Sequence, residues 1–579
     1  MSKFAPAHNY SDIGEVSVTV DSKDTPKDTE PTIAPSTGLG HMKSYYVVVL
    51  CLLALFALLE FGDLNAEYDS MGWTVQHDEK LVVPDARSLY LGGEQKLSDY
   101  REPASAGFGI LGPCLTSLGF RLFGLNNYGL RFVCTTMSVA SMALLVFSLL
   151  RLHPSWLGVL FCAVNLVNYR YFIMAHYSLI EDILILSLCG IAWLYLCRPK
   201  TLLAILNPLA FFGGVLFLFK QMFPVYWLAF LGCIALSERV SLRRFVRFVA
   251  WSFAGLIVFG SLQLVVLHNL GMLSLYTNNI SRALHVLAGG STEGVSLQVY
   301  PEAPGIGGIV PHFVHFLTLW YQPVYAHPNT WFGWEQISIW QANWTMLQFL
   351  GLLGIGFWLS RRKKLSRRTI ALGMFLLGML VVLSQTFFYI KRALPLFPIT
   401  FLFLTSLLGD MLHGSTGTRM AKALTRGALW CTIFFVIYYV IWQGAYVLAK
   451  GSAIRSHGVE RNSRDLEELV SENDAVFMHC YGLRFFWQTR RRIISGDDQL
   501  MNNEIILAKA LRERARFVLL SDRGGTIGQG ECPDCPPWQV RKRHLYFSDI
   551  TDSGYPMVYV LYDLAYGEGN KTSRGSEPS

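Results

Sequence analysis

The run Tyr45-Tyr-Val-Val-Val-Leu-Cys-Leu-Leu-Ala-Leu-Phe-Ala-Leu-Leu-Glu60-Phe61 is the first of a series of apolar segments that decide the fold of this chain. A bilayer core about 30 Å thick needs roughly 20 apolar residues in a helix, and the run approaches that length. We therefore expect a polytopic α-helical membrane protein with about eleven spans, near 45–61, 128–150, 155–171, 178–197, 202–219, 222–237, 248–268, 346–360, 369–389, 393–411 and 428–448.

The composition agrees with a membrane protein. Hydrophobic residues make up 52% of the 579 residues and charged residues only 16%, whereas soluble domains usually carry about 25% charged residues. The net charge of +8 does not indicate nucleic-acid binding, because the basic residues gather in short segments between apolar runs. We find no glycine-rich phosphate loop, zinc-finger spacing or RNA-binding signature in the sequence.

The distribution of basic residues predicts the orientation. If the N-terminus is cytoplasmic, every strongly basic loop falls inside, as the positive-inside rule requires. These loops contain Arg151, Arg198 with Lys200, Arg243 with Arg244, 361–364 with 367–368, and Arg419 with Lys422 and Arg426. We expect a multi-pass protein of the bacterial inner membrane, or of the ER membrane in a eukaryote.

The same orientation predicts the domains. Residues 1–42 are polar and almost free of aromatic residues, which is typical of a disordered cytoplasmic tail, and the late first apolar run favours a signal anchor over a cleaved signal peptide. A transmembrane catalytic domain over 43–448 would carry outer loops at about 62–127 and 269–345. Residues 449–566 form a predicted extracytoplasmic domain, followed by a disordered tail at 567–579.

The extracytoplasmic domain shows an alternating α/β pattern. Strands are predicted at 474–480, 516–520 and 557–562 from short apolar runs, and a periodic helix is predicted at about 502–514. We expect a small α/β domain.

Acidic residues follow the first span. The stretch Gln76-His-Asp78-Glu79-Lys-Leu-Val-Val-Pro84-Asp85-Ala-Arg87-Ser-Leu-Tyr-Leu-Gly-Gly93 lies in a predicted outer loop. Acids in a loop are ordinarily only solvated. Carboxylates placed just outside a bilayer would, however, suit chemistry at the membrane surface.

The order of residues resembles the first loop of the GT-C membrane glycosyltransferases, especially the protein O-mannosyltransferase and aminoarabinose transferase branch. In that pattern an Asp-Glu pair precedes an arginine in a short helix, a glycine, a proline-containing stretch and a second helix that ends in Phe-Gly before an Arg-led span. The matching residues here are Asp78-Glu79, Arg87, Gly92, Pro103 or Pro113, Phe123-Gly124 and Arg131. The resemblance implies that Asp78 is the general base, with Glu79 beside it.

One departure from the family pattern leaves a second candidate for the catalytic carboxylate. Lys80-Leu-Val-Val-Pro84 replaces the usual aromatic helical residues, and Pro84 disfavours a helix at Val83. Asp85 therefore competes with Asp78 for the role of catalytic acid or base.

A second acidic pair, Glu181-Asp182, begins an apolar run at the predicted outer face. Charges at the edge of a membrane helix usually face a cavity or a partner, although they can also extend to the interface. The resemblance implies that this pair shares the cavity, where it would orient the acceptor or hold an optional divalent cation; no other cofactor is implied.

Basic residues could hold a donor phosphate. Lys391 and Arg392 precede Pro395-Leu-Phe-Pro398, which resembles the basic segment that holds the lipid-linked phosphate in the same families. A fixed cation would stabilise the charge of a phosphate leaving group, whereas the alternative is interfacial snorkelling. Arg87 and Arg101 are further candidates.

The resemblance implies an inverting glycosyltransferase that takes a sugar from a polyprenyl- or dolichyl-phosphate and passes it to a lipid, glycan or protein acceptor outside the cytoplasm. Two other classes remain open. A transporter or flippase of lipid-linked sugars would need a polar path across the bilayer, and a silent receptor-like scaffold would not depend on its acidic residues.

Overall fold

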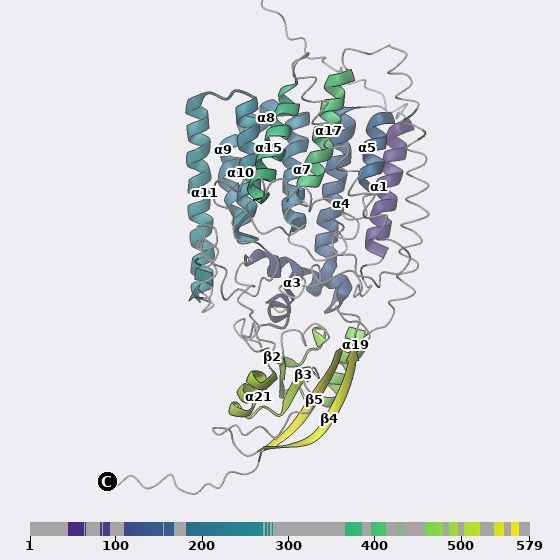
Figure 1. Ribbon diagram of the computed structural model, residues 1–579, viewed down its shortest axis with the longest axis vertical. Helices are drawn as coiled ribbons and strands as arrows, with labels where there is room; N and C mark the ends of the chain where they lie inside the picture. The colour runs from purple at the N-terminus through teal and green to yellow at the C-terminus, as the bar shows by residue number, and fades with distance from the viewer. Residues whose placement is uncertain are drawn as a thin grey trace, which may run out of the picture. The chain divides into compact units, whose positions relative to one another are not determined.

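The structure is a computed structural model, and Figure 1 shows its helical bundle and its C-terminal sheet unit. It describes residues 44–62, 64, 82–83, 85–92, 109–153, 156–166, 181–269, 273–274, 276–277, 281, 365–384, 395–412, 427, 430, 458–478, 486–495, 503–521, 538–548 and 557–566.

The bundle consists of long apolar helices that pack side by side (Figure 1). Their bounds are α1 Ser44–Gly62, α3 Leu111–Phe123, α4 Asn127–Leu152, α5 Trp156–Leu166, α7 Glu181–Cys197, α8 Pro199–Ala204, α9 Leu206–Phe212, the 3-10 helix η3 Gly213–Leu218, α10 Phe223–Ser237, α11 Leu242–Asn269, α15 Arg367–Ser384 and α17 Leu396–Leu412. The central pair is α4 and α7, and α17 and α5 pack against α4.

Three of these helices, α1, α4 and α11, are long and apolar enough to cross a membrane by length and composition. They confirm the predicted spans at 45–61, 128–150 and 248–268, although α11 begins earlier than expected. Shorter apolar helices occupy the other predicted spans except 346–360 and 428–448, which lie almost wholly outside the described residues. The total of about eleven spans therefore stays a prediction.

Apolar helices cover the predicted span at 202–219, but the span is not one continuous helix. The chain instead forms α8, α9 and η3, with a break at Ile205. Pro208 explains the break, because proline has no N–H to donate to the carbonyl of residue 204 and its ring crowds that carbonyl. The segment then tightens into the 3-10 helix at Gly213-Gly214, where the backbone of Gly255 on α11 approaches so closely that a Cβ on Gly214 would lie 2.5 Å from the Gly255 carbonyl oxygen.

Polar side chains join the helices at one end of the bundle. Tyr195 at the end of α7 donates a 2.7 Å hydrogen bond to Glu238, which also forms a 3.3 Å ion pair with Arg367 of α15. Asp410 of α17 accepts hydrogen bonds from the Ser366 backbone N–H at 2.9 Å and from the Thr369 hydroxyl at 2.7 Å. This end therefore contains the last turns of α7, α10 and α17 and the first turn of α15.

The C-terminal sheet unit is a mixed α/β structure. Its elements are α19 Gly458–Leu469, β1 Ala475–Met478, β2 Arg492–Ser495, α21 Asn503–Arg512, β3 Phe517–Ser521, β4 Trp538–Ser548 and β5 Met557–Tyr566. The strand order is β2-β1-β3-β5-β4, with β2, β1 and β3 parallel and β5 antiparallel to both β3 and β4. The predicted strands at 474–480, 516–520 and 557–562 and the predicted helix at about 502–514 are confirmed, whereas β2 and β4 were not predicted.

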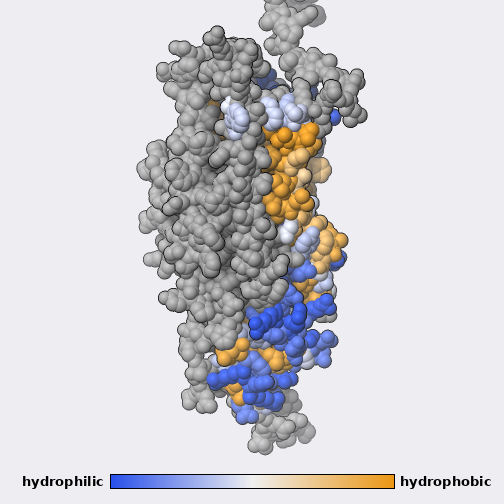
Figure 2. All heavy atoms as spheres, turned by 90° about the vertical axis from the view of Figure 1, so that its right-hand side faces the viewer, coloured by the Kyte–Doolittle hydropathy of each residue, from blue (hydrophilic) through white to orange (hydrophobic). Residues whose placement is uncertain are grey.

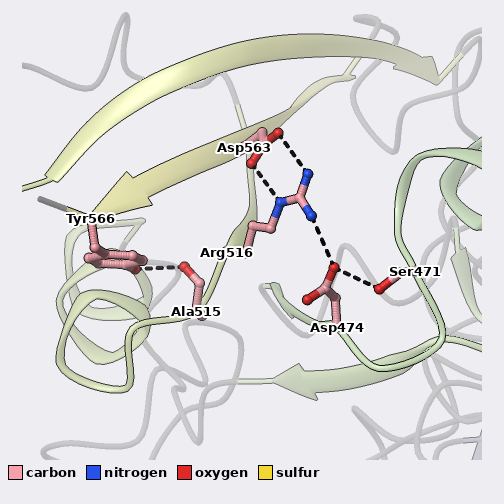
Figure 3. Close-up of polar contacts among 6 residues, drawn as sticks. All are labelled: Ser471, Asp474, Ala515, Arg516, Asp563 and Tyr566. Carbon is pink, nitrogen blue, oxygen red and sulfur yellow. Dashed lines mark hydrogen bonds and ion pairs between the residues drawn. The ribbon is translucent and has the colours of Figure 1, made fainter. Parts of the chain in front are cut away.

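The two faces of the sheet carry separate apolar clusters. One face packs against α21 through Val518, Leu520 and Tyr562, and the other packs toward α19 through Leu519 and Leu561. At one end of the interior strands β3 and β5, the Arg516 side chain donates a 3.0 Å hydrogen bond to Asp563 of β5 and a 3.4 Å hydrogen bond to Asp474 (Figure 3). The hydrogen bond to Asp563 raises the pKa of Arg516 above its ordinary value, so this junction stays charged.

The surfaces of the two parts differ in polarity. In Figure 2 the apolar side chains of α1 form a continuous band, whereas the C-terminal sheet unit presents a largely hydrophilic surface. Val47, Leu50 and Leu58 of α1 are 46%, 41% and 71% exposed, respectively. Such an apolar surface on a long helix suits contact with lipid tails.

Candidate functional site

The acidic pair predicted from the sequence lies at the start of α7, and both carboxylates are buried. Glu181 forms an ion pair with Lys220, which follows η3 and precedes α10. The Glu181 side chain is 3% exposed and the Lys220 side chain 20% exposed, so the ammonium is the more accessible partner. A lysine has three N–H donors, and one of them is used here by Glu181.

Asp182 lies in the same acidic environment. It interacts electrostatically with Glu181 and with Glu60, which is fully buried near the end of α1. No described donor reaches Oε2 of Glu181 or Oδ2 of Asp182. This end of the bundle therefore gathers three carboxylates and one ammonium in a buried setting, where electrostatic interactions are stronger than in water.

Other contacts show which segments meet at this end. Arg131 near the start of α4 donates a 3.2 Å hydrogen bond to the carbonyl of Leu64, just beyond α1. The backbone N–H of Gly109 donates a 2.9 Å hydrogen bond to the carbonyl of Phe219, the residue before Lys220. The segment that leads into α3 therefore packs directly against the corner that carries Lys220.

Glycine at position 109 is required by this contact. A Cβ on Gly109 would lie 1.7 Å from the carbonyl oxygen of Leu218. The neighbouring Ile110 N–H lies 3.5 Å from the buried Gln263 side-chain oxygen on α11. Backbone contacts with two different helices thus fix the entry to α3.

The rival acid Asp85 lies in a short helical segment. Residues 82–83 and 85–90 are helical, and Gly92 follows with a φ of 82°, a left-handed conformation that favours glycine. The prediction that the backbone of Val83 avoids a helix is wrong: Val83 is helical, and its burial in the cluster shared with the sheet unit outweighs the local preference. Asp85 is 6% exposed and interacts electrostatically with Cys114 of α3.

Arg87, a predicted phosphate ligand, is fully buried against the C-terminal sheet unit. Its Nε donates to the carbonyl of Thr489 at 2.9 Å, and its Nη2 donates to the carbonyl of Arg491 at 2.6 Å. These contacts tether Arg87 to the sheet unit, and its role as a phosphate ligand stays a prediction.

The predicted Phe-Gly ending of the second outer helix is confirmed. Helix α3 ends at Phe123, and Gly124 has a φ of 85° with its N–H bonded to the carbonyl of Phe120. Asn126 then caps α4 by accepting a hydrogen bond from the Gly129 N–H at 2.8 Å. This tight connection joins α3 to the span that carries Arg131.

Several predicted residues lie outside the described part of the chain. Those residues are Asp78, Glu79, Arg101, Lys391 and Arg392. The described elements bring Glu181 and Asp182 together and hold Arg87 and Asp85 on one short helix.

Sequence reasoning missed Lys220 and Glu60. Lys220 stands in Phe219-Lys-Gln-Met-Phe223, the polar break between two apolar runs, which is where a charge could have been noticed. Glu60 is a lone acid in the last turn of the first apolar run, and a charge inside such a run is costly unless it has a partner.

The acidic groups do not form a ready metal site among the residues that the structure describes. No set of three or more His, Cys, Asp or Glu side chains in those ranges could hold a metal ion. An optional divalent cation at Glu79, Glu181 or Asp182 therefore remains a proposal.

Comparisons with known proteins give a structural likeness only. No protein-family profile and no curated protein matches the sequence. The crystal structure of ArnT from Cupriavidus metallidurans in the apo state matches with a TM-score of 0.52 and 11% identity, covering 90% of this chain and 98% of that one. The crystal structure of the same protein bound to undecaprenyl phosphate matches with a TM-score of 0.52 and 11% identity, covering 89% and 98%.

An apo oligosaccharyltransferase from Archaeoglobus fulgidus also matches, with 11% identity over 82% of this chain and 70% of that one. Its TM-score of 0.35 is too low to indicate a shared fold. The likeness to ArnT extends over nearly the whole of both chains, from the helical bundle to the C-terminal sheet unit. The chain therefore has the fold of the GT-C membrane glycosyltransferases, to which ArnT belongs.

Proposed function

We propose that the chain is a glycosyltransferase that moves a sugar from a polyprenyl- or dolichyl-phosphate to an acceptor on the extracytoplasmic side of the membrane. The observation that carries the proposal is the buried Lys220–Glu181 pair beside Asp182, at the bundle end where the entry to α3 packs. The fold adds support, because ArnT shares it and has been crystallised with undecaprenyl phosphate.

The proposed donor explains why the site is attached to a membrane bundle. An isoprenoid tail is apolar, so it would stay among the lipid-exposed helices while its phosphate reaches the polar end of the bundle. The Lys220 side chain is 20% exposed, and its ammonium is a cation that could bind a phosphate oxygen. Lys391 and Arg392 are proposed to add positive charge.

The proposed reaction is an inverting transfer. A general base takes the proton from an acceptor hydroxyl or amine as that atom attacks the anomeric carbon, and the bond from that carbon to the phosphate oxygen breaks. The electron pair leaves with the lipid phosphate, whose charge the cations stabilise. General-base assistance of this kind is typically worth about 10²–10⁴ in rate.

Asp78 is the proposed base, and Asp85 is its rival. Asp85 lies on the short helix at 85–90 and is 6% exposed. Glu181 and Asp182 would orient the acceptor. This division assigns proton removal to the loop and substrate orientation to the bundle.

The function is tested by incubating the purified protein in nanodiscs with a panel of polyprenyl-phosphate sugars and measuring donor hydrolysis or transfer. Asp78→Asn should abolish turnover while expression and thermal stability stay normal, and Asp85→Asn should retain more activity. Near-normal turnover of Asp78→Asn together with loss in Asp85→Asn would reverse the assignment. Transport of a lipid-linked sugar across the bilayer without cleavage of the donor would contradict the transferase.

A further inference from the structure

A short segment of the C-terminal sheet unit, residues 486–491, contacts the N-terminal third of the chain at several points. The ring of Trp487 stacks on Phe120 of α3, with centroids 5.7 Å apart and an interplanar angle of 28°. The next residue, Gln488, lies with its Nε2 3.5 Å from Oδ1 of Asn127 at the start of α4. Both contacts reach the connection between the outer loop and the bundle.

The strongest contact of this segment is with Arg87. The guanidinium donates to two carbonyls, those of Thr489 and Arg491, in the planar fork geometry that only arginine offers. Arg87 and Thr489 are both fully buried. A buried charge-assisted contact of this kind is hard to replace, because removal of one partner leaves the other unsatisfied.

Glu467 of α19 forms hydrogen bonds with residues 489–491 of the segment. Its Oε1 accepts hydrogen bonds from the Thr489 hydroxyl at 3.2 Å and from the Arg490 backbone N–H at 2.5 Å. Its backbone carbonyl accepts a 2.7 Å hydrogen bond from Nη2 of Arg491. The turn that presents the two carbonyls to Arg87 therefore depends on one carboxylate.

An apolar cluster connects the same parts. Val83, Ala86 and Phe120 of the outer loop pack in one cluster with side chains of the sheet unit. The members from the sheet unit are Leu466, Val470, Val476, Met478, Phe486, Trp487, Ile493, Phe517, Leu519, Tyr546, Tyr559 and Leu561. The short helix at 85–90 thus shares a core with the sheet unit.

The helix geometry links this anchor to the acidic residue. Successive residues of an α-helix are 100° apart, so Asp85 and Arg87 point about 200° apart, to opposite sides. Fixing Arg87 on the sheet unit directs Asp85 away from it, toward α3, where Asp85 interacts with Cys114. If the contact of Arg87 with the sheet unit were lost, the helix could rotate and the direction of the Asp85 side chain would change.

We propose that the C-terminal sheet unit is a positioning element of the transfer site. Glu467 and Thr489 act as positioning residues: they hold segment 486–491, which binds Arg87 and so sets the orientation of the short helix at 85–90 that carries Asp85. The inference rests on the proposed function, because it assigns the orientation of the helix that carries the candidate acid Asp85 to a part of the chain 402 residues further on.

The test uses the full-length protein in nanodiscs and compares Glu467→Ala and Thr489→Val with Glu467→Gln. The glutamine keeps a side-chain oxygen that can accept both hydrogen bonds, so it should behave like the wild type. Hydrogen exchange of a peptide that covers 82–92 should accelerate in the alanine and valine variants. Their kcat should fall about 10²-fold with the donor KM unchanged, because a displacement near 1 Å is enough for such a loss.

Arg516→Gln is the matched control. Arg516 joins β3 to β5 through Asp563, and its hydrogen bonds and ion pairs among the described residues stay within the sheet unit (Figure 3). This variant should lower the stability of the sheet unit without changing exchange at 82–92 or kcat.

Two results would overturn the proposal. If hydrogen exchange at 82–92 and kcat were both unchanged in Glu467→Ala, segment 486–491 would not control the orientation of the helix at 85–90. Equal losses in Arg516→Gln would show that only the general stability of the sheet unit matters. Hydrogen exchange can be measured on an inactive protein. A wild type that transfers no sugar would contradict the proposed function, and the exchange data would still show whether Glu467 controls the helix at 85–90.

Discussion

The ammonium of Lys220 and the carboxylate of Glu181 form an ion pair in which the lysine is the more exposed partner, with side-chain exposures of 20% and 3%. The aromatic ring of Phe223 lies 5.9 Å from the same ammonium. The buried carboxylate holds the ammonium in place, and the ammonium is the more accessible of the two charged groups. This arrangement suits the binding of a phosphate at the end of a membrane bundle.

Removal of the cation should weaken donor binding. We expect Lys220→Met to raise the dissociation constant for undecaprenyl phosphate by about 10–100-fold, because a charge-assisted hydrogen bond contributes about 1.5–3 kcal/mol. Lys220→Arg should retain part of the affinity. Binding is measured by native mass spectrometry of the protein in lipid-free detergent.

A double variant separates this effect from folding. Lys220→Met alone leaves Glu181 buried without its ion-pair partner, which destabilises the fold. Glu181→Gln combined with Lys220→Met should restore the thermal midpoint but not the affinity. Recovery of binding in the double variant would contradict a phosphate ligand at Lys220.

Gly109 should tolerate no side chain. Gly109→Ala places a Cβ against the backbone of Leu218, which cannot rotate away, so the entry to α3 must move from the Lys220 corner. We expect a lower thermal midpoint and weaker undecaprenyl-phosphate binding. Gly190→Ala on α7 is the control: a Cβ there meets no atom within 4 Å, so this change should be neutral or slightly stabilising.

Asp410 should stabilise the opposite end of the bundle. Asp410→Ala removes the acceptor for the Ser366 N–H and the Thr369 hydroxyl, and we expect a loss of about 1–3 kcal/mol in unfolding free energy. Asp410→Asn keeps a side-chain oxygen that can accept these hydrogen bonds, so it should rescue part of this loss. Undecaprenyl-phosphate binding should not change, and a loss of binding without a loss of stability would contradict a structural role.

Tyr566 should make stability depend on pH in the alkaline range. Its hydroxyl donates a 2.6 Å hydrogen bond to the carbonyl of Ala515, and burial raises the pKa of Tyr566 to about 12, although Arg514 opposes the shift. An unfolded tyrosine titrates near pH 10. A raised pKa means that the stabilisation is complete below about pH 10 and is lost as the pH approaches 12.

The measurement for Tyr566 is the difference in thermal midpoint between the wild type and Tyr566→Phe from pH 8 to pH 12. The difference should be largest at pH 8 and should shrink above pH 10. A difference that does not vary with pH would show that the hydroxyl does not titrate between these values.

The helical bundle could be predicted from the sequence because the burial of apolar runs depends mostly on local composition. The limits of α1 and α4 follow directly from the apolar runs at 45–61 and 128–150. The break at Ile205 was missed because an apolar count ignores the missing N–H of Pro208. The strand β4 was missed because Trp538-Gln-Val-Arg-Lys-Arg-His544 is largely polar, and its strand conformation depends on pairing with β5.

The candidate site was predictable only in part. The acidic pair Glu181-Asp182 stands out because charges are rare in apolar runs, and the structure places both residues in a buried polar cluster. Lys220 finds its partner 39 residues away, which no local pattern indicates. Arg87 binds the backbone carbonyls of Thr489 and Arg491. Every residue has such a carbonyl, so the residue types at 489 and 491 do not indicate the contact.

The core shared by Val83, Ala86 and the sheet unit also constrains biosynthesis. Arg87 emerges from the ribosome 402 residues before Thr489, a delay of about 20–80 s at ordinary synthesis rates. During that interval the short helix at 85–90 lacks the surface that buries it. Final packing of this short helix must therefore follow synthesis of the sheet unit, and a chain that stops before α19 would leave the helix without its tertiary partner.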